Sequence, residues 1–243
     1  MENNETIVND FPRSPVAESF RLFRTNLLYL FENDESKVIC LTSSNAGEGK
    51  SWVCANLAIS CAQYGKKVLI IDADLRKGRQ HRIFKKTNRT GLSDLLKNLR
   101  GEIKEEAASK IEEDLKIKIQ DTEINNVYLL TAGPVPFNPS ELLGTANIDY
   151  LLDTLKKEFD LIIIDTPPAS IITDALIFAT KVDYMFLIAS SRKTKKELLL
   201  NTKKAIEAVG GKIPGIILNQ ISVDRRKEYS KSYQNYASTY SNK

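Results

Sequence analysis

The chain has 243 residues, of which 42% are hydrophobic, and it carries a formal net charge of +4. This length suits one large α/β domain, and the hydrophobic content is enough for a substantial core. The longest apolar runs are far below the roughly 18 residues that a membrane helix needs. The start of the chain is acidic and unlike a signal peptide, so we expect a cytoplasmic protein without a membrane span.

The cysteines and the single histidine exclude two kinds of site. Cys40, Cys54 and Cys61 form no C-x-x-C pair, so we expect small buried thiols in a reducing cytoplasm. His81 has no Cys or His neighbour at ligand spacing. This excludes a zinc site and a nucleophilic triad built on histidine.

Helical and strand patterns alternate along the chain. Residues 13–31 predict a helix, because an apolar residue recurs at steps of four and three from Val16 to Phe31. Further helices are predicted after residue 52, near 91–96, within 101–120, from 139, and at 193–209. Short apolar runs predict strands at 37–42, 67–71, 127–130, 161–164, 184–189 and 213–218. The alternation predicts a doubly wound, mostly parallel sheet with one nucleotide site.

Glu18, Arg21 and Arg24 are spaced by three on the predicted N-terminal helix. They lie off its apolar stripe, so we expect them to face solvent or another chain. From the residues alone, local ion pairs between neighbouring turns are the simpler explanation.

The segment 43–51 predicts a phosphate loop. A strand, a turn with two glycines and a helix direct backbone N–H groups and the positive end of the helix dipole at one point. Lys50 would reach the β and γ phosphates of a nucleotide, and the Ser51 hydroxyl would bind Mg²⁺. Ser44 stands where the G-x-x-x-x-G-K-[ST] pattern has glycine, but the context favours phosphate binding over a helix-capping turn. The predicted nucleotide-binding residues here are Ser44, Asn45, Ala46, Gly47, Glu48, Gly49, Lys50, Ser51 and Trp52.

Aspartates follow two of the predicted strands. Asp72 and Asp74 come after the run at 67–71, and Asp165 comes after the run at 161–164. Open α/β sheets bind ligands at the carboxyl ends of their strands. A carboxylate there, beside a phosphate loop, can hold Mg²⁺ directly or through water. Any one of the three could instead cap a turn.

Asn219 stands just beyond the last predicted strand. Its side-chain amide could donate and accept hydrogen bonds with a purine base. A structural asparagine in a turn explains the position equally well.

The predicted domain spans residues 1–224 and is followed by a tail at 225–243. The tail holds five cations and one anion, and four of the nine tyrosines of the chain. The residues between these tyrosines are mostly polar, which favours disorder over an amphipathic helix. A flexible segment with clustered phenols suggests a substrate, so the predicted phosphate acceptors are Tyr229, Tyr233, Tyr236 and Tyr240.

These features together resemble the bacterial tyrosine kinases (BY-kinases) of capsule and exopolysaccharide synthesis. The resemblance rests on the loop at 44–51, on Asp72-Ala-Asp74-Leu-Arg76, on Asp165-Thr-Pro-Pro168 and on the tyrosine cluster. Residues 91–95 and 133–143 and the Glu18-x-x-Arg21-x-x-Arg24 pattern also look like signatures of that family. The resemblance implies an ATP- and Mg²⁺-dependent protein-tyrosine kinase that phosphorylates its own tail. It also implies a P-loop fold shared with partition-type ATPases.

The resemblance further implies roles and partners. Lys50, Asp72, Asp74 and Asp165 would be catalytic, with Ser51, Asp74 and Asp165 around the metal. Asp72 would accept the tyrosine proton, although Asp72 and Asp74 could exchange roles. Glu18, Arg21 and Arg24 would join copies of the chain into a ring. The implied partners are the cytoplasmic tail of a membrane-embedded activator (a polysaccharide co-polymerase), which would recruit the kinase to the membrane, and a phosphotyrosine phosphatase, with no nucleic acid.

Two alternatives remain open at this stage. A partition or site-selection ATPase would bind DNA or membrane and phosphorylate nothing, but such proteins carry a second lysine where this chain has Asn45, and they leave the tyrosine tail unexplained. A non-catalytic scaffold would use ATP only to stabilise a ring. Trp52 departs from the small polar residue that is more usual in the BY-kinases, and it could crowd the nucleotide.

Overall fold

The computed structural model describes residues 5–31, 35–99 and 105–221. The predicted tail at 225–243, with Tyr229, Tyr233, Tyr236 and Tyr240, lies outside the described residues, as does the proposed domain boundary at 224.

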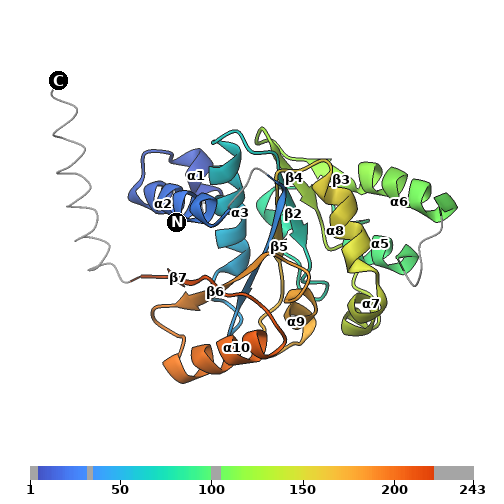
Figure 1. Cartoon of the computed structure of the whole chain (residues 1–243). Helices are drawn as coiled ribbons and strands as arrows, with labels where there is room; N and C mark the ends of the chain where they lie inside the picture. The colour runs from blue at the N-terminus through green and yellow to red at the C-terminus, as the bar shows by residue number, and fades with distance from the viewer. Residues whose placement is uncertain (1–4, 32–34, 100–104, 222–243) are drawn as a thin grey trace.

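A seven-stranded sheet forms the centre of the molecule (Figure 1). Its strand order is β3-β4-β2-β5-β1-β6-β7. All neighbouring pairs are parallel except β3 and β4, which are antiparallel. This confirms the predicted doubly wound, mostly parallel fold. The strands are β1 (Lys37–Ser43), β2 (Val68–Asp72), β3 (Ile119–Asp121), β4 (Val127–Leu130), β5 (Leu161–Asp165), β6 (Tyr184–Ser190) and β7 (Gly215–Asn219).

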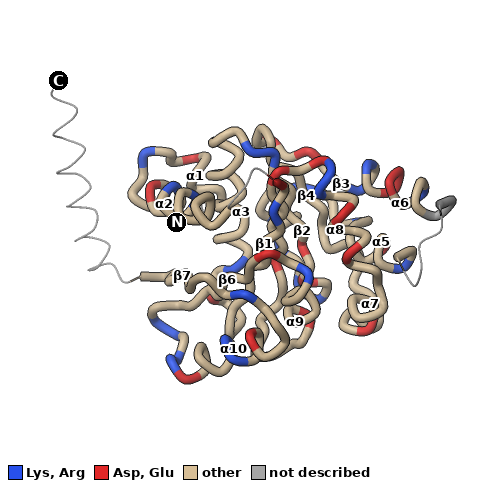
Figure 2. Tube along the Cα trace, in the orientation of Figure 1, with Lys and Arg blue, Asp and Glu red and all other residues tan. Residues whose placement is uncertain are grey.

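Helices cover both faces of the sheet (Figure 1). The helices are α1 (Ile7–Asp10), α2 (Pro15–Leu30), α3 (Lys50–Ala62), α4 (Gln80–Ile83), α5 (Leu92–Asn98), α6 (Glu105–Lys118), α7 (Pro139–Thr145), α8 (Ile148–Lys156), α9 (Asp174–Phe178) and α10 (Lys196–Ala208). Buried residues of α1 to α4 share one core, and buried residues of α5 to α10 share the other. Charged residues lie mainly on the helices and loops around the sheet (Figure 2).

The central strand β5 shows why its sequence is continuously apolar. Leu161 and Ile163 belong to the core beneath α1 to α4, whereas Ile162 and Ile164 belong to the opposite core. All four side chains are buried. A strand covered on both faces needs an apolar residue at every position, which is what the run at 161–164 predicted.

Helix α2 begins two residues later than the predicted helix at 13–31. The Ser14 hydroxyl accepts a hydrogen bond from the backbone N–H of Ala17 at 3.1 Å, and Pro15 takes the first helical position. This cap and proline together fix the start of the helix. The predicted apolar stripe is confirmed, since Phe20 and Leu27 are buried and Phe23 packs edge-on against Phe186.

Five described elements had no counterpart in the sequence analysis, among them the short helices α4 and α9. The short helix α1 and the helix α8 had no predicted counterpart, and β3 adds three antiparallel residues after α6. The three cysteines are free and buried, as expected. Burial raises the pKa of the Cys40 and Cys61 thiols to about 12. None of the described helices is both long and apolar enough to cross a bilayer.

We expect the centre of the sheet to be sensitive to lost volume. Changing Ile163 to Ala should lower the free energy of unfolding by about 2–5 kcal/mol, because a fully buried side chain is replaced by a cavity. Ile171, which is 62% exposed, is the control, and Ile171→Ala should stay within about 0.5 kcal/mol. Chemical denaturation measures both, and equal effects would contradict the assignment of this core.

Candidate active site

The phosphate loop joins β1 to α3 in the conformation that its glycines allow. Gly47 and Gly49 have φ angles of 77° and 90°, in the left-handed region that favours glycine. A Cβ atom at position 49 would lie 2.2 Å from Nδ2 of Asn219. Lys50 is the first residue of α3, so the loop ends at a helix N-terminus, as predicted for phosphate binding.

The predicted nucleotide-binding residues of the loop differ in exposure. Ser44 and Glu48 are buried, whereas Ala46 and Gly47 are exposed, and Asn45, Gly49, Lys50, Ser51 and Trp52 are half-buried. The backbone carbonyl of Ser44 accepts a hydrogen bond from the Ser170 hydroxyl. The Trp52 ring packs edge-on against Phe20 of α2, with centroids 5.3 Å apart. This contact directs Trp52 toward α2.

The Glu48 side chain makes its hydrogen bonds within the protein. It accepts hydrogen bonds from the backbone N–H of Asn45, at 3.0 Å, and from the Thr194 hydroxyl. Thr194 in turn accepts a hydrogen bond from the backbone N–H of Ser190 at 2.7 Å. Glu48 therefore stabilises the loop and ties it to the segment between β6 and α10, a function that the sequence did not reveal.

The end of β7 supports the loop from the other side. Asn219 donates a side-chain hydrogen bond to the backbone carbonyl of Glu48 at 2.9 Å, and Gln220 donates one to the carbonyl of Gly47 at 2.8 Å. Gln220 accepts from the Ser190 hydroxyl at 2.6 Å. Asn219 thus has the structural role that the sequence left open, and its predicted contact with a purine stays a prediction.

Asp72 and Asp165 lie side by side at the carboxyl ends of β2 and β5. They are partners in the parallel register of the two strands, and both are buried. Burial raises the pKa of both carboxyl groups, and the charge of Asp165 raises that of Asp72 further. The Lys50 charge and a hydrogen bond from Ser51 act in the opposite direction on the pKa of Asp165. Two of the predicted site carboxylates and two phosphate-loop residues therefore meet at one point.

The orphaned oxygens of this pair suit a cation. Oδ1 of Asp72 and Oδ1 of Asp165 are buried without a hydrogen-bond partner among the described residues. A buried carboxylate oxygen without a partner is costly unless something binds it. Among the described residues, no group of three or more His, Cys, Asp or Glu side chains is arranged to hold a metal. A Mg²⁺ ion that takes most of its ligands from phosphate and water needs only one or two carboxylates.

Asp74 is placed differently from the other two aspartates. Its Oδ1 accepts hydrogen bonds from the backbone N–H groups of Lys77, at 2.9 Å, and Arg76, at 3.3 Å. Asp74 therefore caps the turn after β2, which was the alternative explanation for any of these aspartates. Its charge still raises the pKa of Asp72 and Asp165, so it stands close to the pair.

The three charged residues of α2 make contacts within the chain. Glu18 and Arg21 form an ion pair at 2.7 Å, and Arg21 also donates to the carbonyl of Pro12. Arg24 donates to the carbonyl of Ser60 in α3 at 3.1 Å and lies over the Tyr64 ring. The long side chain of Arg24 therefore reaches back to the end of α3 and is only partly exposed, and its predicted contact with another chain stays a prediction.

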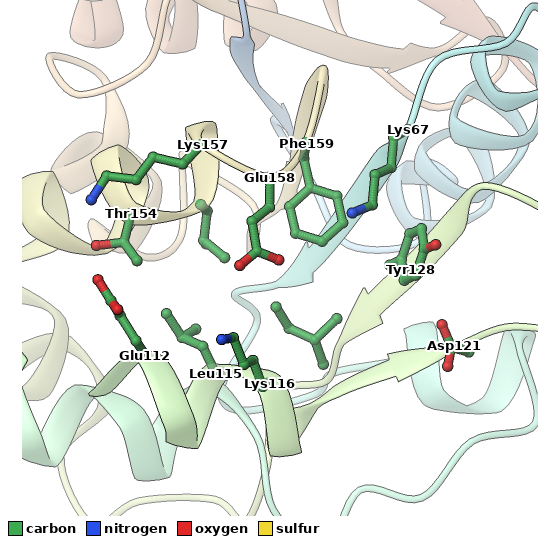
Figure 3. A pocket seen from close by; sticks show the side chains of 12 residues that line it. Lys67, Glu112, Leu115, Lys116, Asp121, Tyr128, Thr154, Lys157, Glu158 and Phe159 are labelled. Carbon is green, nitrogen blue, oxygen red and sulfur yellow. The ribbon is translucent and has the colours of Figure 1, made fainter. Parts of the chain in front are cut away.

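Two hollows flank the sheet. A groove of about 700 Å³ lies between α2 and β7, lined by apolar residues including Phe20 and Ile217, and it reaches Asn219. A cavity of about 270 Å³ lies between α6, α8 and β4 (Figure 3). There the Lys67 ammonium lies over the rings of Tyr128 and Phe159. Lys67 precedes β2 whereas Asp72 ends it, so the smaller cavity lies at the opposite edge of the sheet from the carboxylates.

Comparison with known proteins shows the family to which the chain belongs. A family model described as an AAA domain matches residues 36–196. CapB of Staphylococcus aureus is 35% identical over 93% of both chains. The tyrosine-protein kinase YwqD of Bacillus subtilis is 36% identical over 90% of this chain and 86% of YwqD. The chimerical protein CapA2B2 is 37% identical, with a TM-score of 0.79 over 91% of this chain and 92% of that chain. The chain belongs to the bacterial tyrosine kinases of capsule and exopolysaccharide synthesis.

The kinase shares its fold more widely. The septum site-determining protein MinD of Pyrococcus horikoshii, solved with Mg-ADP, is 23% identical and superposes with a TM-score of 0.58. It covers 82% of this chain and 76% of the MinD chain, and this likeness concerns the fold alone. The P-loop fold of the kinase is a nucleotide-binding fold, as the sequence predicted.

We expect the buried carboxylate pair to destabilise the kinase when no ligand is bound. The pKa of Asp72 is raised above its ordinary value of 3.8, so the folded chain holds this proton more tightly than the unfolded chain. Stability therefore falls as the pH rises from about 4 through the folded pKa. Asp72→Asn, which cannot ionise, should have a free energy of unfolding that is higher by about 1 kcal/mol or more at pH 7. This difference should disappear near pH 4, where the Asp72 carboxyl group is protonated. Chemical denaturation at the two pH values measures it.

The control for this experiment is Asp153→Asn. Asp153 is 73% exposed on α8, so its change should shift stability by no more than about 0.5 kcal/mol at either pH. An Asp72→Asn chain that is less stable than the unaltered one at pH 7 would contradict the electrostatic explanation.

Proposed function

We propose that the kinase transfers the γ-phosphoryl group of ATP to tyrosines of its own tail at the site formed by the phosphate loop, Asp72 and Asp165. The observation that supports this most is the pair of buried carboxylates at the ends of β2 and β5 beside Lys50 and Ser51. Positioning and charge stabilisation supply most of the catalysis of phosphoryl transfer. The site brings together the groups for both.

Each residue has a role that follows from its position. Backbone N–H groups of the loop, other than that of Asn45, which donates to Glu48, would hold the phosphates at the start of α3, with the Lys50 ammonium on the β and γ phosphates. Mg²⁺, when bound, neutralises charge that develops on the phosphates. Ser51 and the unpartnered Oδ1 of Asp165 fit its coordination sphere, and Asp74 would act through water because its carboxylate also caps a turn.

Asp72 is the best candidate for the general base. It is buried and its pKa is raised, and a raised pKa makes a carboxylate a stronger proton acceptor once it is ionised. Its Oδ1 has no hydrogen-bond partner among the described residues, so a tyrosine hydroxyl that enters the site could donate to it. Asp74, whose Oδ1 is already bonded to two backbone N–H groups, is less suited to that role.

The kinase would act as an assembly of several copies with partners at the membrane. Copies of the kinase would form a ring through the α2 face that carries Glu18, Arg21 and Arg24, so that one chain presents its tail to the site of the next. A nucleotide base would lie on the side of Asn219. The cytoplasmic tail of a membrane-embedded activator would recruit the kinase to the inner face of the membrane, and a phosphotyrosine phosphatase would reset it. The name of the chimera CapA2B2, which joins two parts, supports an activator of this kind.

Loss of the phosphate-loop lysine tests the site. Lys50→Met should reduce autophosphorylation with Mg-ATP by at least about a hundredfold, because it removes a cation from the transferring phosphates. Lys204→Met, an exposed change on α10, is the control and should leave the rate unchanged. Immunoblotting for phosphotyrosine measures both, with the activator segment added if the kinase alone is silent. Activity of Lys50→Met within a few-fold of the unaltered chain would refute the site assignment.

Mixing two inactive forms tests transfer between copies. One form carries Lys50→Met and an intact tail, and the other carries Phe at Tyr229, Tyr233, Tyr236 and Tyr240. Each should show little phosphotyrosine alone, whereas the mixture should label the tail of the Lys50→Met chain. Mass spectrometry identifies the labelled chain. Absence of label in a mixture that forms mixed oligomers would argue for transfer within one chain.

Ring formation is tested on Glu18 and Arg21 together. Changing both to Ala should convert a large oligomer to smaller species by light scattering, while circular dichroism stays unchanged. Arg24 is best left intact in this variant, because it also contacts the Ser60 carbonyl within the chain. The pair Lys203 and Glu207, an ion pair on α10, is the matched control. An unaltered mass, or a chain that is monomeric under every condition, would rule out this interface.

A further inference from the structure

One buried side chain bridges all three parts of the site and has no role in the mechanism above. Gln80 is the first residue of α4 and is fully buried. Its backbone N–H donates to Oδ2 of Asp72 at 2.9 Å. Its side-chain Nε2 donates to Oδ2 of Asp165 at 2.8 Å and to the backbone carbonyl of Ser51 at 3.0 Å. Gln80 thus connects the ends of β2 and β5 with the first turn of α3.

The chemistry of the partners fixes the orientation of this amide. The Asp165 carboxylate and the Ser51 carbonyl both accept hydrogen bonds, so only the NH₂ end of the glutamine can face them. Both N–H groups of Nε2 are thereby used. The Oε1 atom is buried without a partner among the described residues, so the side chain gives up one hydrogen bond to make these two.

The turn before α4 is shaped to bring Gln80 to this position. A Cβ atom at Gly78 would lie 2.9 Å from Oδ2 of Asp72 and 2.7 Å from Cβ of Ala132. The missing side chain therefore lets the chain fold back over the Asp72 carboxylate. Asp74 caps the same turn through the backbone N–H groups of Arg76 and Lys77.

Gln80 bonds to only one of the two oxygens of each carboxylate. In both Asp72 and Asp165, Oδ2 is bonded to Gln80, and Oδ1 has no hydrogen-bond partner in the part of the chain that the structure describes. A lysine or arginine at position 80 would neutralise a carboxylate and compete with a bound cation. An amide donates hydrogen bonds without adding a positive charge, so it does not compete with a cation for the carboxylates.

We propose that Gln80 is a positioning residue for phosphoryl transfer: it holds Oδ2 of Asp165 and Oδ2 of Asp72 and so presents both Oδ1 atoms to the reacting groups. Oδ1 of Asp165 is presented to the surroundings of Mg²⁺, and Oδ1 of Asp72 to the tyrosine hydroxyl. This inference rests on the proposed function and adds a residue to it.

Gln80→Met removes the side-chain hydrogen bonds of Gln80 and keeps the volume of its side chain. Methionine has a similar length and fills the space, but it cannot donate to Asp165 or Ser51, whereas the backbone N–H to Asp72 remains. Outer-shell partners of metal ligands are worth about 10–100-fold in metal affinity or activity. We expect the Mg²⁺ concentration for half-saturation to rise about tenfold or more, and kcat to fall by a similar factor. Affinity for ADP without Mg²⁺ should stay within about twofold, because the bond that is lost ends on the carbonyl of Ser51, whereas Lys50 and the backbone N–H groups that would bind phosphate are not substituted.

The fluorescence of Trp52 provides a readout that is independent of turnover. Trp52 is the single tryptophan of the chain and directly follows Ser51. Titration of the full chain with ADP, first with a chelator and then with increasing Mg²⁺, gives the two affinities separately. Arg82→Met is the matched control, since Arg82 is exposed on the same short helix, and it should leave both affinities unchanged.

The Mg²⁺ dependence of Gln80→Met tests the positioning role of Gln80. A Gln80→Met chain with the Mg²⁺ dependence of the unaltered chain overturns the inference, and so does an equal loss of ADP affinity with and without Mg²⁺, which would show a purely structural role. If Gln80→Met does not fold by circular dichroism, Gln80→Asn, whose shorter amide cannot reach both partners, is judged by the same two affinities. Failure of both variants to fold also overturns the inference. An unaltered chain that does not bind Mg-ADP would instead contradict the proposed function.

Discussion

The parallel register of β2 and β5 places two buried carboxylates next to each other. Asp72 and Asp165 end their strands at the same level, and burial raises the pKa of both. Without a ligand this arrangement is unfavourable, because two like charges compete for few compensating groups. Lys50, Ser51 and Gln80 compensate in part. A divalent cation with its nucleotide would supply the missing charge, so the geometry that costs stability in the free protein is the geometry that favours binding.

The phosphate loop is held by side chains that come from distant parts of the sequence. Glu48 is bonded to Thr194, the carbonyl of Gly47 is bonded to Gln220, and the carbonyl of Glu48 is bonded to Asn219. These three bonds end on loop carbonyls or on the Glu48 carboxylate, so they use none of the loop N–H groups. The N–H of Asn45 donates to Glu48, and the other backbone N–H groups of the loop remain for phosphates. A loop that is held before binding loses less conformational entropy when a nucleotide arrives.

The sequence predicted every described strand except β3, and also the phosphate loop and the aspartates, because these features are local. A continuous apolar run signals a strand that is covered on both faces, and the residue that follows it must lie at the sheet edge. Gln80, Thr194 and Gln220 could not be found in this way, because nothing in their neighbourhood signals a partner that lies far along the chain. Arg24 shows a second limit. Helical periodicity gives the side of α2 on which Arg24 starts, but a long side chain can return to a neighbouring helix. For Asp74 the sequence is compatible with a metal site and with a turn cap, and only the geometry shows the cap.

The position of β7 in the chain has a consequence for how the kinase is made. The two amides that hold the phosphate loop, Asn219 and Gln220, lie at the end of β7, the last strand of the described residues, and directly after it, whereas the loop itself belongs to the first quarter of the sequence. During synthesis on the ribosome, the loop and its helix emerge long before the residues that hold them. The loop can reach its final form only when synthesis has passed residue 220, so the newly made chain acquires its nucleotide site as one of its last folding events.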